Sequence, residues 1–457
     1  MMDKTHQYDL DQDAALYRPI YQTGRGYYVV GGIFLAVYLF SIYMYYAQIR
    51  NGLGVTGMNQ PVTWGFYIVN FVFFIGISHA GTLISAILRV THAGWRTPVT
   101  RMAEFITVVA LSVGGLFPLI DMGRPERVLN LIKYGRWSSP ITWDILAIST
   151  YLTGSLIYLL LPMIPDLAIC RDKLGKQGGN FRRFLYRILS VGWRDTTAQK
   201  KNLFSGMGIM AILIIPIAVS VHTVVSFIFA MTLRAGWNST VYGIYFVAGA
   251  IFSGIATIII VMAILRKAFH LEEYITKSHF QKLGYMLGAF TVIMAYFNVL
   301  EFLVPGYKMI EGEEFLLQQI LAGTYAPVYW AYILFGLIIP AIIVLVPRTR
   351  TIAWLVFASI LINITMAMER FLIVVPAMRV PLMPYEPANY FPSWVEWSII
   401  AGAVAGFALI ISIFAKLFPV ISIWEVREQH DEQHAHVAQE AGGGESVTAI
   451  PRIGRHT

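Results

Sequence analysis

Residues 239–265 read STVYGIYFVAGAIFSGIATIIIVMAIL, a stretch of 27 residues without one charged side chain. An α-helix needs about 20 apolar residues to cross the hydrocarbon core of a bilayer. Nine other segments are similarly apolar. The ten predicted spans are residues 27–49, 62–88, 99–120, 141–164, 205–231, 239–265, 283–304, 325–346, 350–372 and 395–418. A soluble protein would have to hold ten fully apolar helices in one core, so the sequence predicts an all-α integral membrane protein.

The basic residues are unevenly distributed about these spans. The chain carries a net charge of +8 and 34 Lys and Arg residues. If the N-terminus is cytoplasmic, 25 of them lie on that side or at the span ends that face it, and eight lie on the other side, with Arg370 deeper inside a span. Segment 165–204 is basic and partly amphipathic, which favours a position on the inner membrane surface over binding to nucleic acid. The positive-inside rule predicts that both termini are cytoplasmic.

The single cysteine, Cys170, limits the redox chemistry of this chain. An iron–sulfur cluster held by cysteine needs about four such ligands, so we expect no cluster here, and an internal disulfide is excluded. A redox metal would need histidine ligands or another subunit. Residues 1–26 are polar and give no sign of a secretory signal peptide, so the first span is expected to remain in place.

The middle eight spans suggest a duplication. Pro-Ile-Thr-Trp at 140–143 and Pro-Val-Tyr-Trp at 327–330 open corresponding helices, and 76–81 loosely matches 249–254. A repeat of four helices predicts two four-helix bundles of equal orientation, with two flanking helices. The expected parts are a cytoplasmic arm (1–26), a flanking helix and loop (27–61), a first bundle (62–231), a second bundle (232–372), a loop and flanking helix (373–423) and a mobile cytoplasmic tail (424–457).

Ionisable groups inside a membrane cost roughly 2.5–3.5 kcal/mol each, so each needs a structural or functional reason. The helix directions place six in the outer half and one nearer the midplane: Asp121, Asp144, His222, Glu301, Glu369 and Arg370, with His79 deeper. Structural roles are open for several of them. Asp121 can cap its helix and pair with Arg124, and Asp144 lies near a helix start, where a carboxylate favours the helix dipole.

Glu369 and Arg370 are adjacent and therefore point about 100° apart on a helix. This predicts that they do not simply face each other and that each needs a partner from another helix, with Glu301 as a candidate for Arg370. We expect Arg370 to pair with Glu301 or Glu369, and His222 to join through water. The group is either a structural clamp or the lining of a proton path, and the clamp is slightly favoured because arginine cannot release its proton.

The two membrane histidines, His79 and His222, stand beside small and hydroxyl residues. Three roles are open for these histidines. They can be hydrogen-bonded packing residues, they can carry protons near neutral pH, or they can be the two ligands of one haem. A cytochrome with two haems would need four such histidines, and these two are not enough.

Proton-coupled oxidation of a quinol fits this set better, because the reaction releases two electrons and two protons. His79, Asp121 and Asp144 have the chemistry to accept the protons. Trp143 and Tyr67 are candidates to pack against the quinol ring. A partner subunit would have to take the electrons at the outer face. The complete candidate site is His79, Asp121, Arg124, Trp143, Asp144 and Tyr67, with no metal ligand among them.

At these motifs the chain resembles the NrfD/polysulfide-reductase membrane-subunit family. The motifs are Trp-Gly-Phe-Tyr at 64–67, Gly-Ile-Ser-His-Ala-Gly-Thr at 76–82, Asp-Met-Gly-Arg-Pro at 121–125 and Pro-Ile-Thr-Trp-Asp at 140–144. Within that family it looks most like the larger NrfD-like subunit of bacterial alternative complex III, through 218–226 and Met-Glu-Arg-Phe at 368–371. The resemblance covers roughly residues 20–420.

The resemblance implies two four-helix bundles in the bacterial cytoplasmic membrane, a quinol site near the periplasmic face, and no haem or iron–sulfur cluster in this chain. It implies a respiratory or photosynthetic complex that oxidises menaquinol or ubiquinol and reduces a periplasmic carrier. The implied partners are a periplasmic iron–sulfur subunit, multihaem and monohaem c-type cytochromes, and a paralogous NrfD-like membrane subunit. A proton path is implied as well, and its candidate residues are His222, Glu301, Glu369 and Arg370.

Other classes of function stay open on the sequence alone. Repeats, polar residues near the midplane and helices rich in Gly and Pro also fit a secondary transporter. A haem-containing cytochrome is a third reading, and an absorption spectrum would test it. A structural membrane anchor without a quinone site is the fourth.

Overall fold

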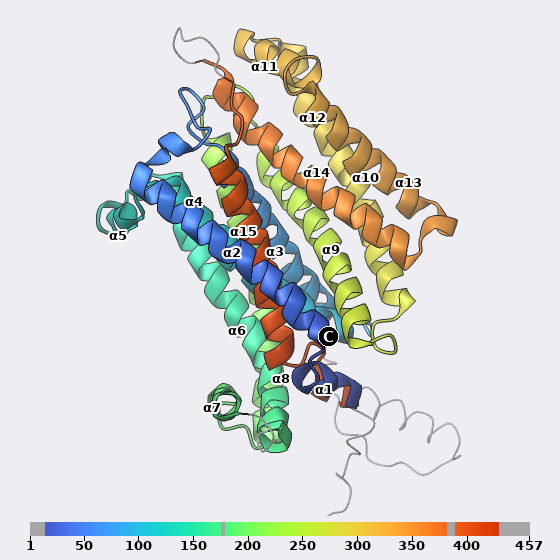
Figure 1. Ribbon diagram of the computed structural model, residues 1–457. Coiled ribbons are helices and arrows are strands. Elements are labelled where there is room, and N and C mark those ends of the chain that lie inside the picture. Colours follow the sequence, from blue (N-terminus) through green and yellow to red (C-terminus); the bar gives the residue numbers. More distant parts are fainter. Residues whose placement is uncertain (1–13, 175–178, 382–388, 429–457) are drawn as a thin grey trace, which may run out of the picture.

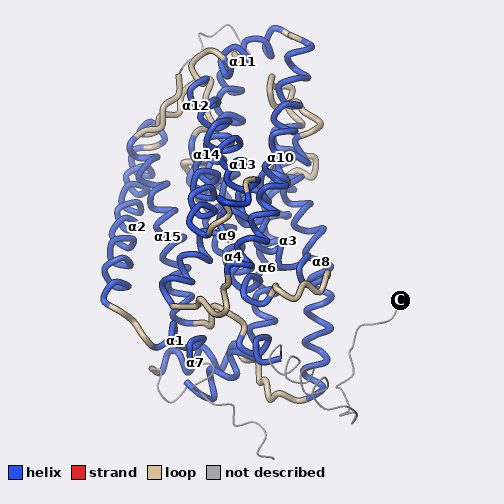
Figure 2. Tube along the Cα trace, turned by 90° about the vertical axis from the view of Figure 1, so that its right-hand side faces the viewer, coloured by secondary structure: helices blue, strands red, loops and turns tan. Residues whose placement is uncertain are grey.

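The computed structural model describes residues 14–174, 179–381 and 389–428, and within those ranges it is built of helices without a strand. Figure 1 shows the helices running side by side along one direction, and Figure 2 shows the same arrangement from the side. Ten helices are long and apolar enough to cross a membrane. The prediction of an all-α integral membrane protein with ten spans is therefore confirmed.

Each predicted span has a counterpart in the structure. The spans are α2 (Arg25–Asn51), α3 (Phe66–Val90), α4 (Thr97–Asp121), α6 (Pro140–Leu174), α8 (Thr197–Ala230), α9 (Tyr242–Phe269), α10 (Lys277–Lys308), the α12–α13 unit (Ala326–Leu345), α14 (Ile352–Arg379) and α15 (Trp394–Leu417). Several helices are longer than predicted. The predicted spans are apolar stretches that end where charged residues begin, whereas the helix itself can continue beyond those charged residues.

The spans pack as two groups with an outer pair. The first helix group is α3, α4, α6 and α8, and the second helix group is α9, α10, α12–α13 and α14. α3 joins the two, because it contacts α9 and α14 as well as α4 and α8. α2 and α15 pack along each other on the outside (Figure 1).

Small residues permit the closest helix contacts. A side chain on Gly81 of α3 would collide with the backbone oxygen of Ala103 in α4. A side chain on Gly254 of α9 would collide with Ala80 of α3. Close backbone approach through such residues is a common source of stability between helices in membranes, where burial of apolar surface gives no net drive.

The α12–α13 unit is not a regular helix. α12 (Ala326–Ala331) passes into a π-helical segment, Tyr332–Ile338, before α13 (Ile339–Leu345). Pro340 has no backbone N–H, so one carbonyl of the preceding turn loses its donor and the helix must adjust. Segments of π-helix are frequent at functional sites, and Tyr332 indeed lines the cavity described below.

The two ends of the molecule carry different short elements, and we name the ends by their place in Figure 1. The upper end holds α5 (Val128–Tyr134), α11 (Glu311–Leu321) and the turns Leu53–Val55 and Pro125–Arg127. The lower end holds α1 (Ala14–Tyr21), α7 (Asn180–Leu189) and residues 418–428. Phe181, Phe184 and Ile188 of α7 are exposed between arginines, as expected for an amphipathic surface helix.

The structure differs from the sequence prediction at both terminal regions. Within the predicted polar arm, residues 14–21 form α1, and Leu16, Tyr17 and Ile20 are buried. Within the predicted mobile tail, residues 424–428 are helical, and Glu425 is only 3% exposed. Polar composition suggested a free chain in each case, but both segments have partners elsewhere in the fold. Residues 1–13 and 429–457 lie outside the described residues.

Candidate functional site

A buried carboxylate, Asp144, and a partly buried one, Asp121, lie at the upper end of the first helix group. Asp121 is the last residue of α4, and Asp144 lies in the second turn of α6. Each has a buried oxygen, Oδ1, without a hydrogen-bond partner among the described residues. A buried carboxylate oxygen without a partner is unfavourable. Both groups are therefore suited to accept a hydrogen bond or a proton from a bound molecule.

A short chain of hydrogen bonds fixes the helix end that carries Asp121. The Tyr67 hydroxyl donates to Gln48 Oε1 at 2.6 Å, and Gln48 Nε2 donates to the Ile120 carbonyl at 3.0 Å. This joins α2, α3 and α4. Tyr67 is fully buried, so it positions the site rather than offering a free hydroxyl to a ligand.

Glu396 is a fully buried carboxylate that was not predicted from the sequence. It accepts hydrogen bonds from Gly57 N at 2.7 Å, Ser393 N at 2.8 Å and the Tyr390 hydroxyl at 2.5 Å. The Tyr390 oxygen accepts in turn from Phe66 N at 2.7 Å. Burial, followed by the charge of Glu396, raises the pKa of Tyr390 well above its ordinary value. Glu396 thus connects the loop with Gly57 and the loop with Tyr390 and Ser393 to the start of α3.

Trp143 and Arg124 lie at the rim. Trp143 is 49% exposed, its indole N–H donates to the Trp137 carbonyl at 2.7 Å, and the two rings lie 5.8 Å apart. Arg124 is exposed. Asp144 is buried although it follows Trp143 directly, because adjacent helix positions point in different directions. The aromatic pair marks the exposed side of the α6 start.

The structure brings His79 and His222 together. Their ring centroids are 4.7 Å apart with an interplanar angle of 47°, and both side chains are fully buried. The His222 ring nitrogens lack a hydrogen-bond partner among the described residues, whereas the His79 ring interacts with the backbone of Ala218. His79 lies twelve residues beyond Tyr67 on α3, roughly 18 Å deeper along the helix. It therefore groups with His222 rather than with Asp121 and Asp144. The two rings contact each other directly, which leaves no room for a haem between them.

The prediction that Glu369 and Arg370 cannot face each other is wrong. Arg370 Nη1 lies 3.3 Å from Glu369 Oε2, because both side chains are long enough to bend towards each other despite their different directions. A side chain on Gly249 would collide with the Arg370 guanidinium, which lies over the Phe246 ring at 4.8 Å. The expectation that Arg370 pairs with Glu301 or Glu369 is thus met by Glu369.

Glu301 belongs to a cavity of about 60 Å³ at the upper end of the second helix group. It accepts a hydrogen bond from the Ser239 hydroxyl at 3.2 Å. Glu313 Oε2 has no partner among the described residues, and the Tyr332 hydroxyl interacts with that of Tyr245. The polar lining comprises Tyr242, Tyr245, Asn298, Glu301, Glu313, Tyr329, Tyr332 and Glu369. A polar cavity of this size has room for a few water molecules.

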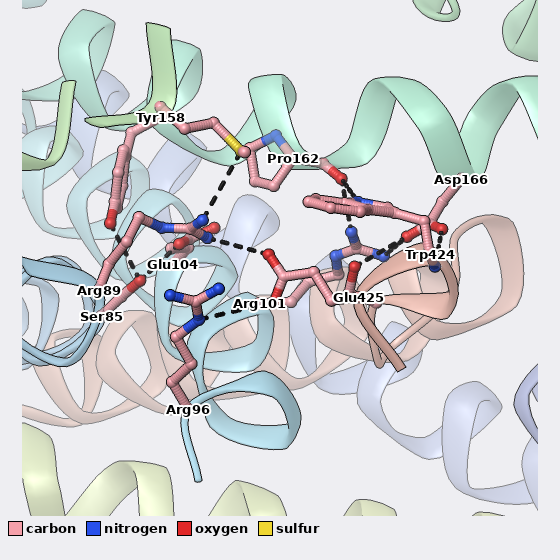
Figure 3. A network of polar contacts seen from close by, with 12 residues as sticks. Ser85, Arg89, Arg96, Arg101, Glu104, Tyr158, Pro162, Asp166, Trp424 and Glu425 are labelled. Carbon is pink, nitrogen blue, oxygen red and sulfur yellow. Dashed lines mark hydrogen bonds and ion pairs between the residues drawn. The ribbon is translucent and has the colours of Figure 1, made fainter. Parts of the chain in front are cut away.

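A second polar network lies at the lower end of the first helix group (Figure 3). Its buried charges are Arg89, Arg101, Glu104, Asp166 and Glu425. Arg101 pairs with Asp166, Arg89 Nη2 lies 3.3 Å from Glu425 Oε1, and the Ser85 hydroxyl donates to Glu104 Oε1 at 2.5 Å. This network was not predicted from the sequence. Arg101 and Glu104 lie inside a predicted span, and these two charged residues could have indicated a buried polar network there.

Comparison with known proteins shows relatives over most of the chain. The family model described as polysulphide reductase, NrfD, matches residues 54–381. A selenate reductase subunit of Mesobacillus selenatarsenatis is 26% identical over 84% of this chain and 92% of its own length. The Hdr-like menaquinol oxidoreductase integral membrane subunit of Archaeoglobus fulgidus is 24% identical over 89% and 96%. The menaquinone reductase integral membrane subunit of Nitratidesulfovibrio vulgaris is 22% identical over 83% and 88%.

Proposed function

Because the chain belongs to the NrfD polysulphide reductase family, we propose that it is the membrane subunit of a complex that oxidises quinol near the upper end of the first helix group. Its relatives include membrane subunits of menaquinol- and menaquinone-linked oxidoreductases. The observation that carries the proposal for the site is the carboxylates of Asp121 and Asp144, each with a buried oxygen lacking a partner among the described residues.

In the proposed reaction a menaquinol or ubiquinol headgroup enters from the bilayer past Trp143. Its two hydroxyls donate hydrogen bonds to Asp121 and Asp144, with Arg124 at the rim. Oxidation to the quinone releases two electrons and two protons. The carboxylates take the protons, since positioned acid–base groups of this kind serve such transfers. The electrons pass to an iron–sulfur cluster in a partner subunit at the upper face.

The proposed setting is a bacterial complex similar to alternative complex III. The lower end would face the cytoplasm, because most Lys and Arg residues lie on that side. The upper end would face the periplasm, where the iron–sulfur subunit and the c-type cytochromes would dock. A paralogous membrane subunit would lie beside this chain in the bilayer.

Proton translocation is a further part of the proposal. Buried polar groups extend from the cavity with Glu301 to Glu369 and Arg370, and the charge of Arg370 acts on His222. From the histidine pair, polar groups continue towards the lower network. They include Tyr151, whose hydroxyl donates to the Ser78 carbonyl at 3.0 Å, and then Ser85 and Glu104. Water in the cavity would complete the upper part of this route.

The proposed quinol site is tested by Asp121→Asn and Asp144→Asn in the assembled complex. Each should lower quinol oxidation at least tenfold, because acid–base groups contribute typically 10²–10⁴-fold. Asp172→Asn is the matched control, since Asp172 is an exposed carboxylate at the other end of α6. Unchanged turnover in both assembled variants would refute the site and favour a structural anchor. Solute movement by the isolated chain would favour a transporter.

A further inference from the structure

Residues 418–428 follow α15 and lie against the lower ends of α3, α4 and α6. We call this segment the strap. Its residues 423–428 are helical. Val420, Ile421, Ile423 and Val426 are buried in it. Figure 3 shows Trp424 and Glu425 among the buried polar groups of the first helix group.

Asp166 of α6 holds the start of the strap's helical turn. Its carboxylate accepts hydrogen bonds from Trp424 N at 2.9 Å and Ile423 N at 3.2 Å. The first N–H groups of a helix have no partner within the helix, and they favour a negative charge. The strap lacks a capping side chain of its own for these two groups, and Asp166 supplies it from another helix.

Arg101 of α4 anchors the segment just before that turn. Besides its ion pair with Asp166, its Nη1 donates to the carbonyls of Pro419 and Ile421 at 3.4 Å each. The indole N–H of Trp424 donates to the Pro162 carbonyl at 2.9 Å. The buried Arg101–Asp166 pair therefore binds both the carbonyl and the N–H groups of the strap.

Glu425 connects the buried network to the surface. Its Oε1 lies 3.3 Å from Arg89 Nη2, and its Oε2 lies 4.0 Å from Arg96 Nε. The side chain of Arg89 is 9% exposed and that of Arg96 is 23% exposed. On its inner side Arg89 interacts with the charge of Glu104. The strap thus places a carboxylate between the buried Arg89 and the more exposed Arg96.

We infer that the strap is a closure over the lower end of the buried polar groups, docked by Asp166, Arg101 and Arg89 and able to open as one segment. The anchors are charged groups near the end of the helix bundle. When the strap leaves, the buried Arg101 and Asp166 stay paired with each other, Arg89 keeps Glu104 nearby, and Glu425 moves into water. Opening therefore leaves no charge stranded alone in the core, which is the costly case for a buried ion pair. The strap would then control the entry of protons to the proton route, and this part of the inference rests on the proposed function. The docking of the strap on Asp166, Arg101 and Arg89 is independent of the proposed function.

Cys170 provides a native reporter of opening. It is the only cysteine of the chain, is fully buried, and lies one helical turn beyond Asp166 on the same face of α6. In the intact complex, the rate at which a water-soluble maleimide modifies Cys170 is measured by mass spectrometry of its peptide. Glu425→Gln and Trp424→Ala should each raise that rate at least tenfold. Glu272→Gln, an exposed glutamate in the α9–α10 connection at the same end, should leave it unchanged.

Equal Cys170 rates in wild type and both strap variants would overturn the inference. The role in proton entry has a separate readout. Quinol oxidation itself releases one proton per electron, so Glu425→Gln should lower the ratio of protons released per electron towards one. An unchanged ratio with faster Cys170 modification would overturn that role while the docking stands. A wild-type complex that does not oxidise quinol would refute the proposed function, and the Cys170 rates would still decide on the strap.

Discussion

His79 of α3 and His222 of α8 lie against each other near the middle of the bundle, with ring centroids 4.7 Å apart and the rings tilted by 47°. The pair lies between the polar groups of the second helix group and those at the lower end of the first. The His79 ring has the Ala218 backbone as a polar partner, whereas no described residue is hydrogen-bonded to the His222 ring. His222 is therefore poorly explained as packing alone, because buried polar atoms in native proteins normally have partners.

We predict that His222→Leu assembles as well as wild type, because the substitution removes no described hydrogen bond of the ring. If the pair carries translocated protons, the ratio in this variant should fall towards the one proton per electron that quinol oxidation itself releases, while quinol oxidation continues. The measurement uses the complex reconstituted in vesicles, with a pH-sensitive dye and an electron acceptor. A normal ratio in this variant would remove the histidine pair from the route.

Removal of Arg370 should harm assembly more than turnover. Glu369 would be left as a buried charge without its ion pair, which destabilises by roughly 3–5 kcal/mol. Arg370→Met should reduce the yield of complex, and the surviving complexes should oxidise quinol at a normal rate. Normal yield and thermal stability for this variant would contradict the clamp.

Glu301 allows the clamp and the proton path to be distinguished, because it lies in the cavity and not in the Arg370 ion pair. Glu301→Gln should assemble normally and lower the proton-to-electron ratio if the cavity conducts protons. The exposed Glu311 at the same end serves as the control, as Glu311→Gln. Identical ratios in wild type and Glu301→Gln would rule out a conducting role for Glu301.

The spans were predictable because a long stretch without charged side chains, such as 239–265, is stable as a helix in the hydrocarbon core of a bilayer. The buried charges were harder to predict. Glu425 is buried only because its partners Arg89 and Arg96 lie elsewhere in the chain, and its local sequence is that of a polar tail. The contact between His79 and His222 likewise depends on how α3 and α8 pack, which cannot be predicted from the local sequence of either helix.

Glu396 should be a structural residue of the upper end. Glu396→Ala leaves Gly57 N, Ser393 N and the Tyr390 hydroxyl without their acceptor, and each such loss costs roughly 1–3 kcal/mol when buried. The melting temperature of the complex should fall clearly, whereas Glu311→Ala should leave it unchanged. A melting temperature equal to wild type would show that these three donors find other acceptors.

The charge distribution predicts the orientation. Reporter fusions after residues 310 and 430 should read periplasmic and cytoplasmic, because the lower end carries most of the basic residues. The two readings must differ, since an odd number of predicted spans separates the fusion points. The same reading at both points would contradict the number of spans between them. The reverse assignment would contradict the orientation and place the quinol site on the other face.

A map of the intact complex with bound quinone tests the proposed quinol site most directly. We predict quinone density at the upper end of α3, α4 and α6, with the headgroup oxygens in hydrogen-bond contact with Asp121 and Asp144 and an iron–sulfur cluster of a partner subunit directly above. Quinone density confined to the cavity around Glu301, or a partner cluster at the opposite end of the helices, would contradict it.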